Sequence, residues 1–174
     1  FTVTVTDIDE ADISGISDSD GAAETVSEDA GIGTAVGITA LATDDDVEDD
    51  VTYSLSDDAG GLFTIDANSG IITTAASLDY ETATSHSITV LATSDDTSTS
   101  SRTFTISVTD VNDNAPVITA GQTFSVSESA ANTFSLGNAV ATDVDTGTTL
   151  SGWTITGGNV DGIFDIETAS GEIT

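Results

Sequence analysis

A short run of oxygen-bearing side chains occupies residues 110–116, where the sequence reads Asp-Val-Asn-Asp-Asn-Ala-Pro. A Ca²⁺ ion takes about six to eight oxygen ligands from carboxylates, amide side chains and backbone carbonyls. This run offers all three kinds of ligand, and it follows an alternating apolar segment at 102–109. The sequence therefore predicts a calcium-binding linker directly after a β-strand.

Further acidic motifs recur along the chain. Glu28 is matched by Glu128, and the triplet at 44–46 is matched by Asp-Val-Asp at 143–145, each about 100 residues later. An internal repeat of this length is typical of a β-sandwich domain with seven strands.

The linker and the acidic motifs together resemble the tandem calcium-binding repeats of the cadherin family. The resemblance includes Leu-Asp-Tyr-Glu at 78–81 and extends over nearly the whole chain, because residues 1–6 are similar to 104–109. It implies an all-β fold of tandem Greek-key β-sandwiches with immunoglobulin-like architecture. It also implies three Ca²⁺ ions between consecutive repeats. The implied ligands are Glu28, Asp79, Glu81, Asp110, the carbonyl of Val111, Asn112, Asp113, the carbonyl of Asn114, Asp143 and Asp145.

In this pattern Asp113 and Asp145 each contact two ions, and so they join one repeat to the next. The same pattern gives the third ion one more aspartate, which would lie beyond Thr174, so this site is expected to be weakened.

The motifs predict four segments. Residues 1–12 are the last strand and linker of a preceding repeat, and 13–109 form a complete repeat. Residues 110–116 are the calcium-binding linker, and 117–174 begin a second repeat.

Alternation of apolar and hydroxyl side chains predicts strands and no helices. In the complete repeat the expected strands are 24–26, 34–42, 51–55, 62–66, 71–75, 86–92 and 102–109. In the second repeat they are 123–127, 133–142, 151–156, 163–166 and 172–174. Trp153 aligns with residues 52–53 and is a candidate core residue.

An earlier metal site with altered coordination is expected at the first linker, which lacks the proline. Its expected ligands are Asp7, Asp9, Asp44, Asp46 and Asp95, with Asp96 as an alternative to the last. The additional acids at 48–50 are interpreted as a solvated loop.

The charge balance excludes several classes of function. The 174 residues include 31 acidic and one basic residue, Arg102, for a formal net charge of −30. Without a basic patch the chain has no means of binding nucleic acid. It has no cysteine and no lysine, and neither a Ser-His-Asp arrangement nor a phosphate-binding loop is recognisable, so no enzyme is predicted. The single histidine, His86, is interpreted as a surface residue on the outward face of its strand.

These features predict an extracellular module that Ca²⁺ makes rigid, acting in cell adhesion or as an extension rod of a large membrane-associated surface protein. Its predicted partners are calcium ions and adjacent repeats of the same chain. The Ala-, Thr- and Asp-rich composition favours a bacterial adhesin. One alternative is a module that binds a polysaccharide or another cell-surface protein. Another is a fibre subunit in which residues 1–6 are donated as a strand to a neighbouring copy.

Overall fold

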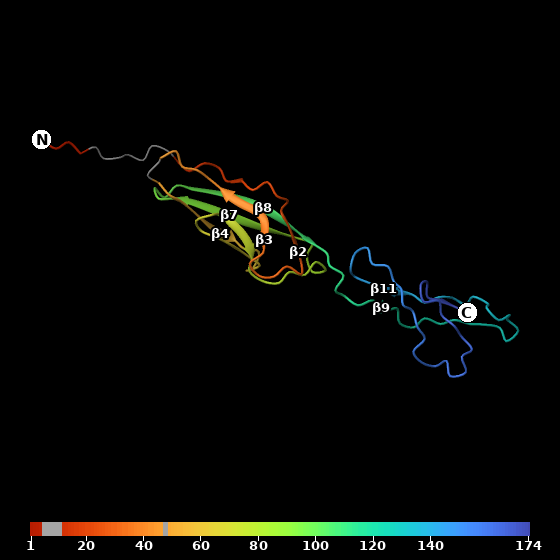
Figure 1. The fold of residues 1–174 in the computed structure, drawn as a ribbon. Helices are drawn as coiled ribbons and strands as arrows, with labels where there is room; N and C mark the ends of the chain where they lie inside the picture. Colours follow the sequence, from red (N-terminus) through yellow and green to blue (C-terminus); the bar gives the residue numbers. More distant parts are fainter. Residues whose placement is uncertain (5–11, 47–48) are drawn as a thin grey trace. The chain divides into compact units, whose positions relative to one another are not determined.

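Two four-stranded sheets pack face to face in the first part of the molecule (Figure 1). The computed structural model describes residues 1–4, 12–46 and 49–174, and it divides into unit 1 (Phe1–Val111) and unit 2 (Asn112–Thr174). The first sheet of unit 1 contains, in spatial order, β1 (Ser17–Asp18), β3 (Ala35–Leu41), β6 (Ile71–Thr74) and β5 (Phe63–Ile65). The second sheet contains β2 (Thr25–Ser27), β8 (Thr99–Thr109), β7 (Ser85–Ser94) and β4 (Val51–Asp57).

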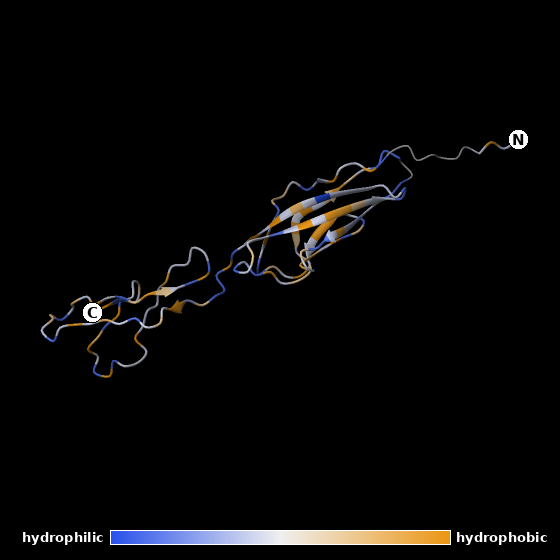
Figure 2. Ribbon diagram, turned by 180° about the vertical axis from the view of Figure 1, so that it is seen from behind, coloured by the Kyte–Doolittle hydropathy of each residue, from blue (hydrophilic) through white to orange (hydrophobic). Residues whose placement is uncertain are grey.

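The sandwich forms because alternate residues of each strand are apolar and point to the space between the sheets. Six valine and isoleucine side chains among them are at most 1% exposed, namely Val36, Ile38, Ile72, Ile88, Val90 and Ile106. Burying one such side chain contributes roughly 1.5–3 kcal/mol. Figure 2 shows the resulting alternation of hydrophobic and hydrophilic bands along the strands of unit 1. The predicted all-β sandwich is confirmed, and every strand expected between residues 24 and 109 is present within a few residues of its predicted bounds.

Among the described residues there is no helix that is long and apolar enough to cross a membrane. The segment expected as a strand at 1–6 lies partly outside the described residues, and residues 1–4 belong to no sheet. The two-residue strand β1, which pairs with the end of β3, has too little alternation to be recognised in the sequence.

Unit 2 repeats the turn that closes the β5–β6 hairpin of unit 1. Gly70 has a φ of 71° and its carbonyl accepts the N–H of Ala40 at 2.9 Å. Gly171 has a φ of 72° and accepts the N–H of Ala139 at the same distance. A Cβ at Gly70 would lie 2.2 Å from the Ala40 oxygen, so both the conformation and the space require glycine. The repeat seen in the sequence is therefore also seen in the structure, because both units form the same turn with the same backbone hydrogen bond.

The strands of unit 2 are much shorter than expected. They are β9 (Val117–Ile118) with β11 (Ala141–Thr142), and β10 (Gly137–Asn138) with β12 (Glu172–Ile173). The predictions of strands at 123–127 and 151–156 are wrong, and at 163–166 a single bridge forms, between Ile166 and Ile173.

The reason is the lack of hydrogen-bond partners. In unit 1, β2 pairs with β8 and β4 pairs with β7. No part of unit 2 corresponds to β7 and β8, so the segments equivalent to β2 and β4 have no ladder to join. Their apolar side chains, among them Phe124, Val126 and Ile155, remain exposed, and Trp153 lines an open cavity of about 260 Å³.

The outward orientation expected for His86 is wrong. His86 has the same strand parity as Ile88, it is half-buried, and its ring lies 5.8 Å from the ring of the core residue Phe63. Its Nε2 atom is shielded from solvent and has no hydrogen-bond partner among the described residues. The register of β7 places it on the inner face despite its polar neighbours, Ser85 and Ser87.

We expect His86→Phe to raise the free energy of unfolding by about 1 kcal/mol, because it removes a buried polar atom without a partner and keeps the ring contact. Urea unfolding measures this change. Ser87→Phe is the control, because Ser87 is exposed and should give no gain. A lower stability of His86→Phe than of the control would contradict the inward placement.

Candidate metal centre

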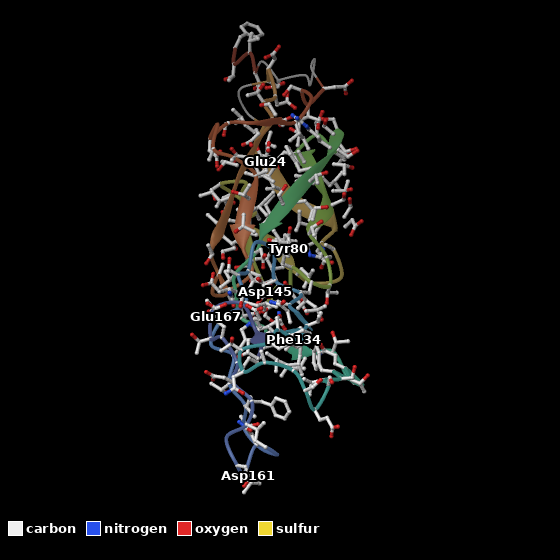
Figure 3. All side chains as sticks on the ribbon, turned by 90° about the vertical axis from the view of Figure 1, so that its right-hand side faces the viewer. Glu24, Tyr80, Phe134, Asp145, Asp161 and Glu167 are labelled. Atoms are coloured by element: carbon white, nitrogen blue, oxygen red, sulfur yellow. The ribbon has the colours of Figure 1, made fainter. Side chains whose placement is uncertain are left out.

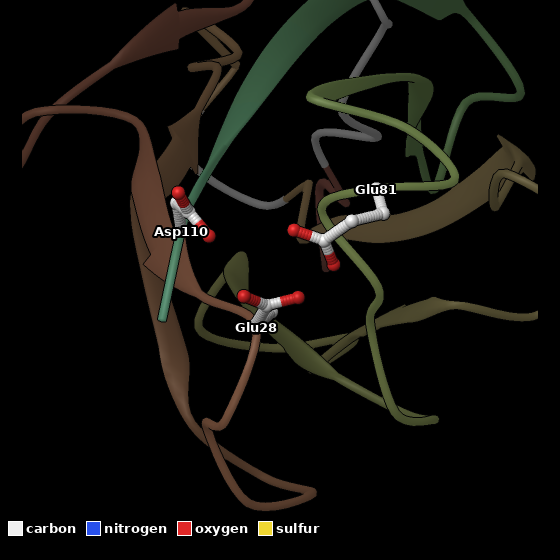
Figure 4. A group of neighbouring side chains, drawn as sticks. All are labelled: Glu28, Glu81 and Asp110. Atoms are coloured by element: carbon white, nitrogen blue, oxygen red, sulfur yellow. The ribbon is translucent and has the colours of Figure 1, made fainter. Parts of the chain in front are cut away.

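Three carboxylates converge at one end of unit 1. Oxygen atoms of Glu28, Glu81 and Asp110 all lie within 4.8 Å of one another (Figure 4). Glu28 and Asp110 directly follow β2 and β8, which run parallel and pair Ser27 with Thr109. Because parallel strands end at the same edge of a sheet, this pairing brings the two acids together.

The Glu28 carboxylate also ties three segments of unit 1 together. It is 6% exposed. Its Oε2 accepts the backbone N–H of Tyr80 at 2.7 Å, and its Oε1 accepts the N–H of Val111 at 2.7 Å. Hydrogen bonds to an ionised acceptor are the stronger class, so they hold the end of β2, the 79–83 turn and the start of the linker in place.

The donor set fits a hard cation. Three carboxylates with oxygens within 4.8 Å of one another repel, by roughly 1–3 kcal/mol per pair near that distance, depending on the effective dielectric. The single basic side chain of the sequence is engaged elsewhere: the guanidinium of Arg102 donates to the carbonyl of Ile16 and lies 4.7 Å from the ring centre of Phe104. A divalent cation with oxygen preference would remove this repulsion.

Asp79, which was predicted as a ligand, does not belong to this group. Its Oδ2 accepts the Thr82 hydroxyl at 2.8 Å and its Oδ1 accepts the Thr82 N–H at 3.0 Å. These bonds, the hydroxyl first, lower the pKa of Asp79. Because the folded pKa is depressed, their contribution to stability is present above the ordinary aspartate pKa and is lost as the pH falls through the lowered value.

A second set of ligand atoms lies within unit 2. The carboxylates of Asp113 and Asp145 have oxygens within 4.8 Å of each other. Asp145, labelled in Figure 3, is 5% exposed and donates its N–H to Oδ1 of Asp143 at 3.1 Å. The Asn112 side chain contacts the Thr148 hydroxyl at 3.3 Å.

Asn114 has a role that the sequence analysis missed. The resemblance implied its carbonyl as a ligand, whereas in the structure its side-chain amide donates to both Asp113 and Asp145. The sequence could have indicated this role, because Asn114 directly follows Asp113 and a side-chain amide can donate a hydrogen bond to a neighbouring carboxylate.

A third acidic group lies at the other end of unit 1. It consists of Asp44, Asp49 and Asp96, again with oxygens within 4.8 Å. Asp96 takes the place that Asp95, which is exposed, was expected to fill, and Asp49 is half-buried where a solvated loop was expected. Asp46 lies beside this group and donates its N–H to Oδ1 of Asp44 at 3.1 Å.

The two remaining predicted ligands of that end, Asp7 and Asp9, lie outside the described residues.

Comparison with known proteins identifies relatives of this fold and site. The profile of the Cadherin domain matches residues 23–109, half of the chain. Protocadherin-23 from Homo sapiens is 47% identical over 96 residues, covering 53% of this chain and 3% of that protein. Cadherin-7 from Gallus gallus is 46% identical over 95 residues, covering 52% of this chain and 12% of that protein. The chain thus spans a small part of the length of these relatives.

Among solved structures, the crystal structure of mouse Cadherin-23 EC22-24 matches with a TM-score of 0.72 and 29% identity. The match covers 97% of this chain and 55% of the other. These relatives are animal proteins, so the prediction of a bacterial adhesin has no support from them.

The two hydrogen bonds of Glu28 give a test that needs no metal. In chelator, Glu28→Ala should lower the free energy of unfolding by about 1 kcal/mol more than Glu28→Gln, because the glutamine amide oxygen still accepts one of the two N–H groups, whereas alanine accepts neither. Both variants remove the same charge, so their difference in urea unfolding reports the one hydrogen bond that the glutamine oxygen retains. Glu24→Ala, at an exposed position, is the control. Equal stability of the alanine and glutamine variants would mean that Glu28 does not tie the three segments together.

Proposed function

The chain belongs to the cadherin family, and from this premise we propose that it is a calcium-stiffened repeat segment of an extracellular adhesion protein. The observation that carries the proposal is the convergence of Glu28, Glu81 and Asp110 at the end of unit 1 from which the linker departs. The Cadherin domain, whose family model matches residues 23–109, is an adhesion domain of a non-enzymatic family.

The proposed cations have ligands in both units. Unit 1 would supply Glu28, Glu81 and Asp110, together with the carbonyl of Val111. Unit 2 would supply Asp113 and the residues that support it. Asp110 and Asp113 are three residues apart, so their Cα atoms are at most about 11 Å apart even in a fully extended chain. The chain itself therefore keeps Asp113 in the neighbourhood of Asp110.

Ligands that both units share would convert a hinge into a rigid joint. A short linker with little apolar surface leaves two domains free to move by default. Val111, Ala115 and Pro116 are the apolar side chains of the linker itself, and they offer little area to bury. The proposal therefore assigns the stiffness of the linker to bound Ca²⁺.

The proposal extends to the other end of unit 1. Asp44, Asp49 and Asp96 would complete a site with the linker of a preceding repeat, including Asp7 and Asp9. The segments 13–109 and 117–174 would then be successive repeats of one rod. The rod would present an adhesive surface away from the cell, with adjacent repeats and other surface molecules as its partners.

Calcium should raise the melting temperature. With dissociation constants of about 0.1–1 mM, as is usual for extracellular modules, 10 mM Ca²⁺ stabilises the folded form by roughly 1.4–2.7 kcal/mol per site. For a domain of this size the melting temperature should rise by about 10 °C relative to chelator. Differential scanning calorimetry measures it.

The control must separate binding from screening, because a chain with a net charge of −30 gains stability from any salt. NaCl at equal ionic strength and MgCl₂ at equal concentration serve this purpose. A rise in NaCl as large as that in CaCl₂ would refute the calcium sites.

Calcium should also restrict the movement of the two units. Small-angle scattering in CaCl₂ should fit a narrow distribution of sizes, and scattering in chelator a broad one. Asp113→Ala should give the broad distribution under both conditions because it removes the expected shared ligand. Asp161→Ala, at an exposed loop of unit 2, should behave as the wild type. Identical distributions with and without Ca²⁺ in the wild type would refute the stiffening.

A further inference from the structure

Three N–H groups of one neutral residue reach two carboxylates in unit 2. The Nδ2 of Asn114 donates to Oδ1 of Asp113 at 2.8 Å and to Oδ1 of Asp145 at 2.9 Å. The backbone N–H of Asn114 donates to Oδ2 of Asp145 at 3.0 Å. Asp113 is the neighbour of Asn114, whereas Asp145 is 31 residues away. The amide therefore joins the linker to a distant turn.

The two acids need such a support when no cation is present. Their oxygens lie within 4.8 Å of each other, and like charges at this distance repel. Hydrogen bonds donated to both carboxylates hold their oxygens in place in spite of this repulsion. Asp145 is held from a further side, because its own N–H is bound to Asp143.

A neutral donor suits a cation site better than a charged one. A lysine or arginine between Asp113 and Asp145 would neutralise the carboxylates and would oppose the entry of a divalent cation. An amide orients them and leaves their charge in place. Its orientation is also determined, because an amide oxygen turned toward two carboxylates would place acceptors against acceptors.

We propose that Asn114 is a positioning residue, whose side-chain amide sets the carboxylates of Asp113 and Asp145 in a metal-ready arrangement before Ca²⁺ binds. The inference deepens the proposed function and rests on it. It concerns the side chain, in addition to the ligand role that the family resemblance gives to the carbonyl of the same residue. Hydrogen-bonding partners of metal ligands are commonly worth about 10–100-fold in metal affinity.

The first test measures Ca²⁺ affinity by isothermal titration calorimetry on the full chain. Asn114→Leu has a similar volume and retains the backbone N–H and carbonyl, but it lacks the side-chain donors. We expect it to bind Ca²⁺ at the linker about 10-fold or more weakly than the wild type. Asn138→Leu is the matched control, because the Asn138 amide of unit 2 donates to the backbone carbonyl of Ser170 and to no carboxylate. It should bind Ca²⁺ within twofold of the wild type.

The second test needs no metal. In chelator at neutral pH, the ¹³C resonances of the Asp113 and Asp145 carboxylates report their hydrogen bonding. Both should shift in Asn114→Leu, whereas the carboxylate of Asp161, on a distant loop of the same unit, should not. Asn114→Ala repeats both measurements with a side chain that cannot overfill the turn, so the inference remains testable if the leucine variant does not fold.

The outcomes separate the inference from the proposed function. If the wild type binds Ca²⁺ and the Asn114 variants bind it equally tightly, the positioning role is overturned and the calcium linker stands. If the carboxylate resonances do not move, the positioning role is likewise overturned. If the wild type binds no Ca²⁺, the proposed function fails, and with it the purpose assigned to the amide, even where the resonances move.

Discussion

The Glu28 carboxylate is the interaction on which the linker end of unit 1 depends. Its two oxygens each accept one backbone N–H, from Tyr80 and from Val111, at 2.7 Å. This arrangement can form only where β2 and β8 run parallel and end together. The sandwich topology, the start of the linker and the convergence of the three acids are therefore consequences of one another. The fold brings the three carboxylates together, and the Glu28 carboxylate in turn holds the neighbouring segments in place.

The acidic side chains of unit 1 are also largely kept apart from its sheets. The described strands of unit 1 contain carboxylates only at Asp18 and Asp57, although the chain is strongly acidic. The remaining acids among the described residues of the unit lie outside the strands. Sheet formation thus proceeds without like charges facing each other across strands. The repulsion is concentrated at the ends, where a bound cation would relieve it.

Strand positions in unit 1 could be predicted from the sequence because alternation reports burial directly. The strands of unit 2 could not, because a strand also needs a partner, and the equivalents of 123–127 and 151–156 pair with segments that have no counterpart here. His86 was misjudged from its serine neighbours, although its parity with Ile88 placed it inside. Similarly, Asp96 and not Asp95 joins Asp44 because of the local conformation of the turn after β7, which spacing alone does not reveal.

The two junctions of unit 1 share the same acidic turn but differ in the linker residue that could support it. The turn at Asp143 and Asp145 and the turn at Asp44 and Asp46 have the same hydrogen bond, from the N–H of the second aspartate to Oδ1 of the first, at 3.1 Å in both. This hydrogen bond forms within the three-residue motif and does not depend on the linker. The amide that spans Asp113 and Asp145 belongs to the linker, and the first linker has Ala11 at the equivalent position. An alanine has no side-chain N–H group. The acidic turn at the first junction therefore cannot receive the side-chain hydrogen bond that Asn114 donates at the second. The sequence of the linker, more than that of the turn, therefore decides how far a junction is arranged before a cation binds.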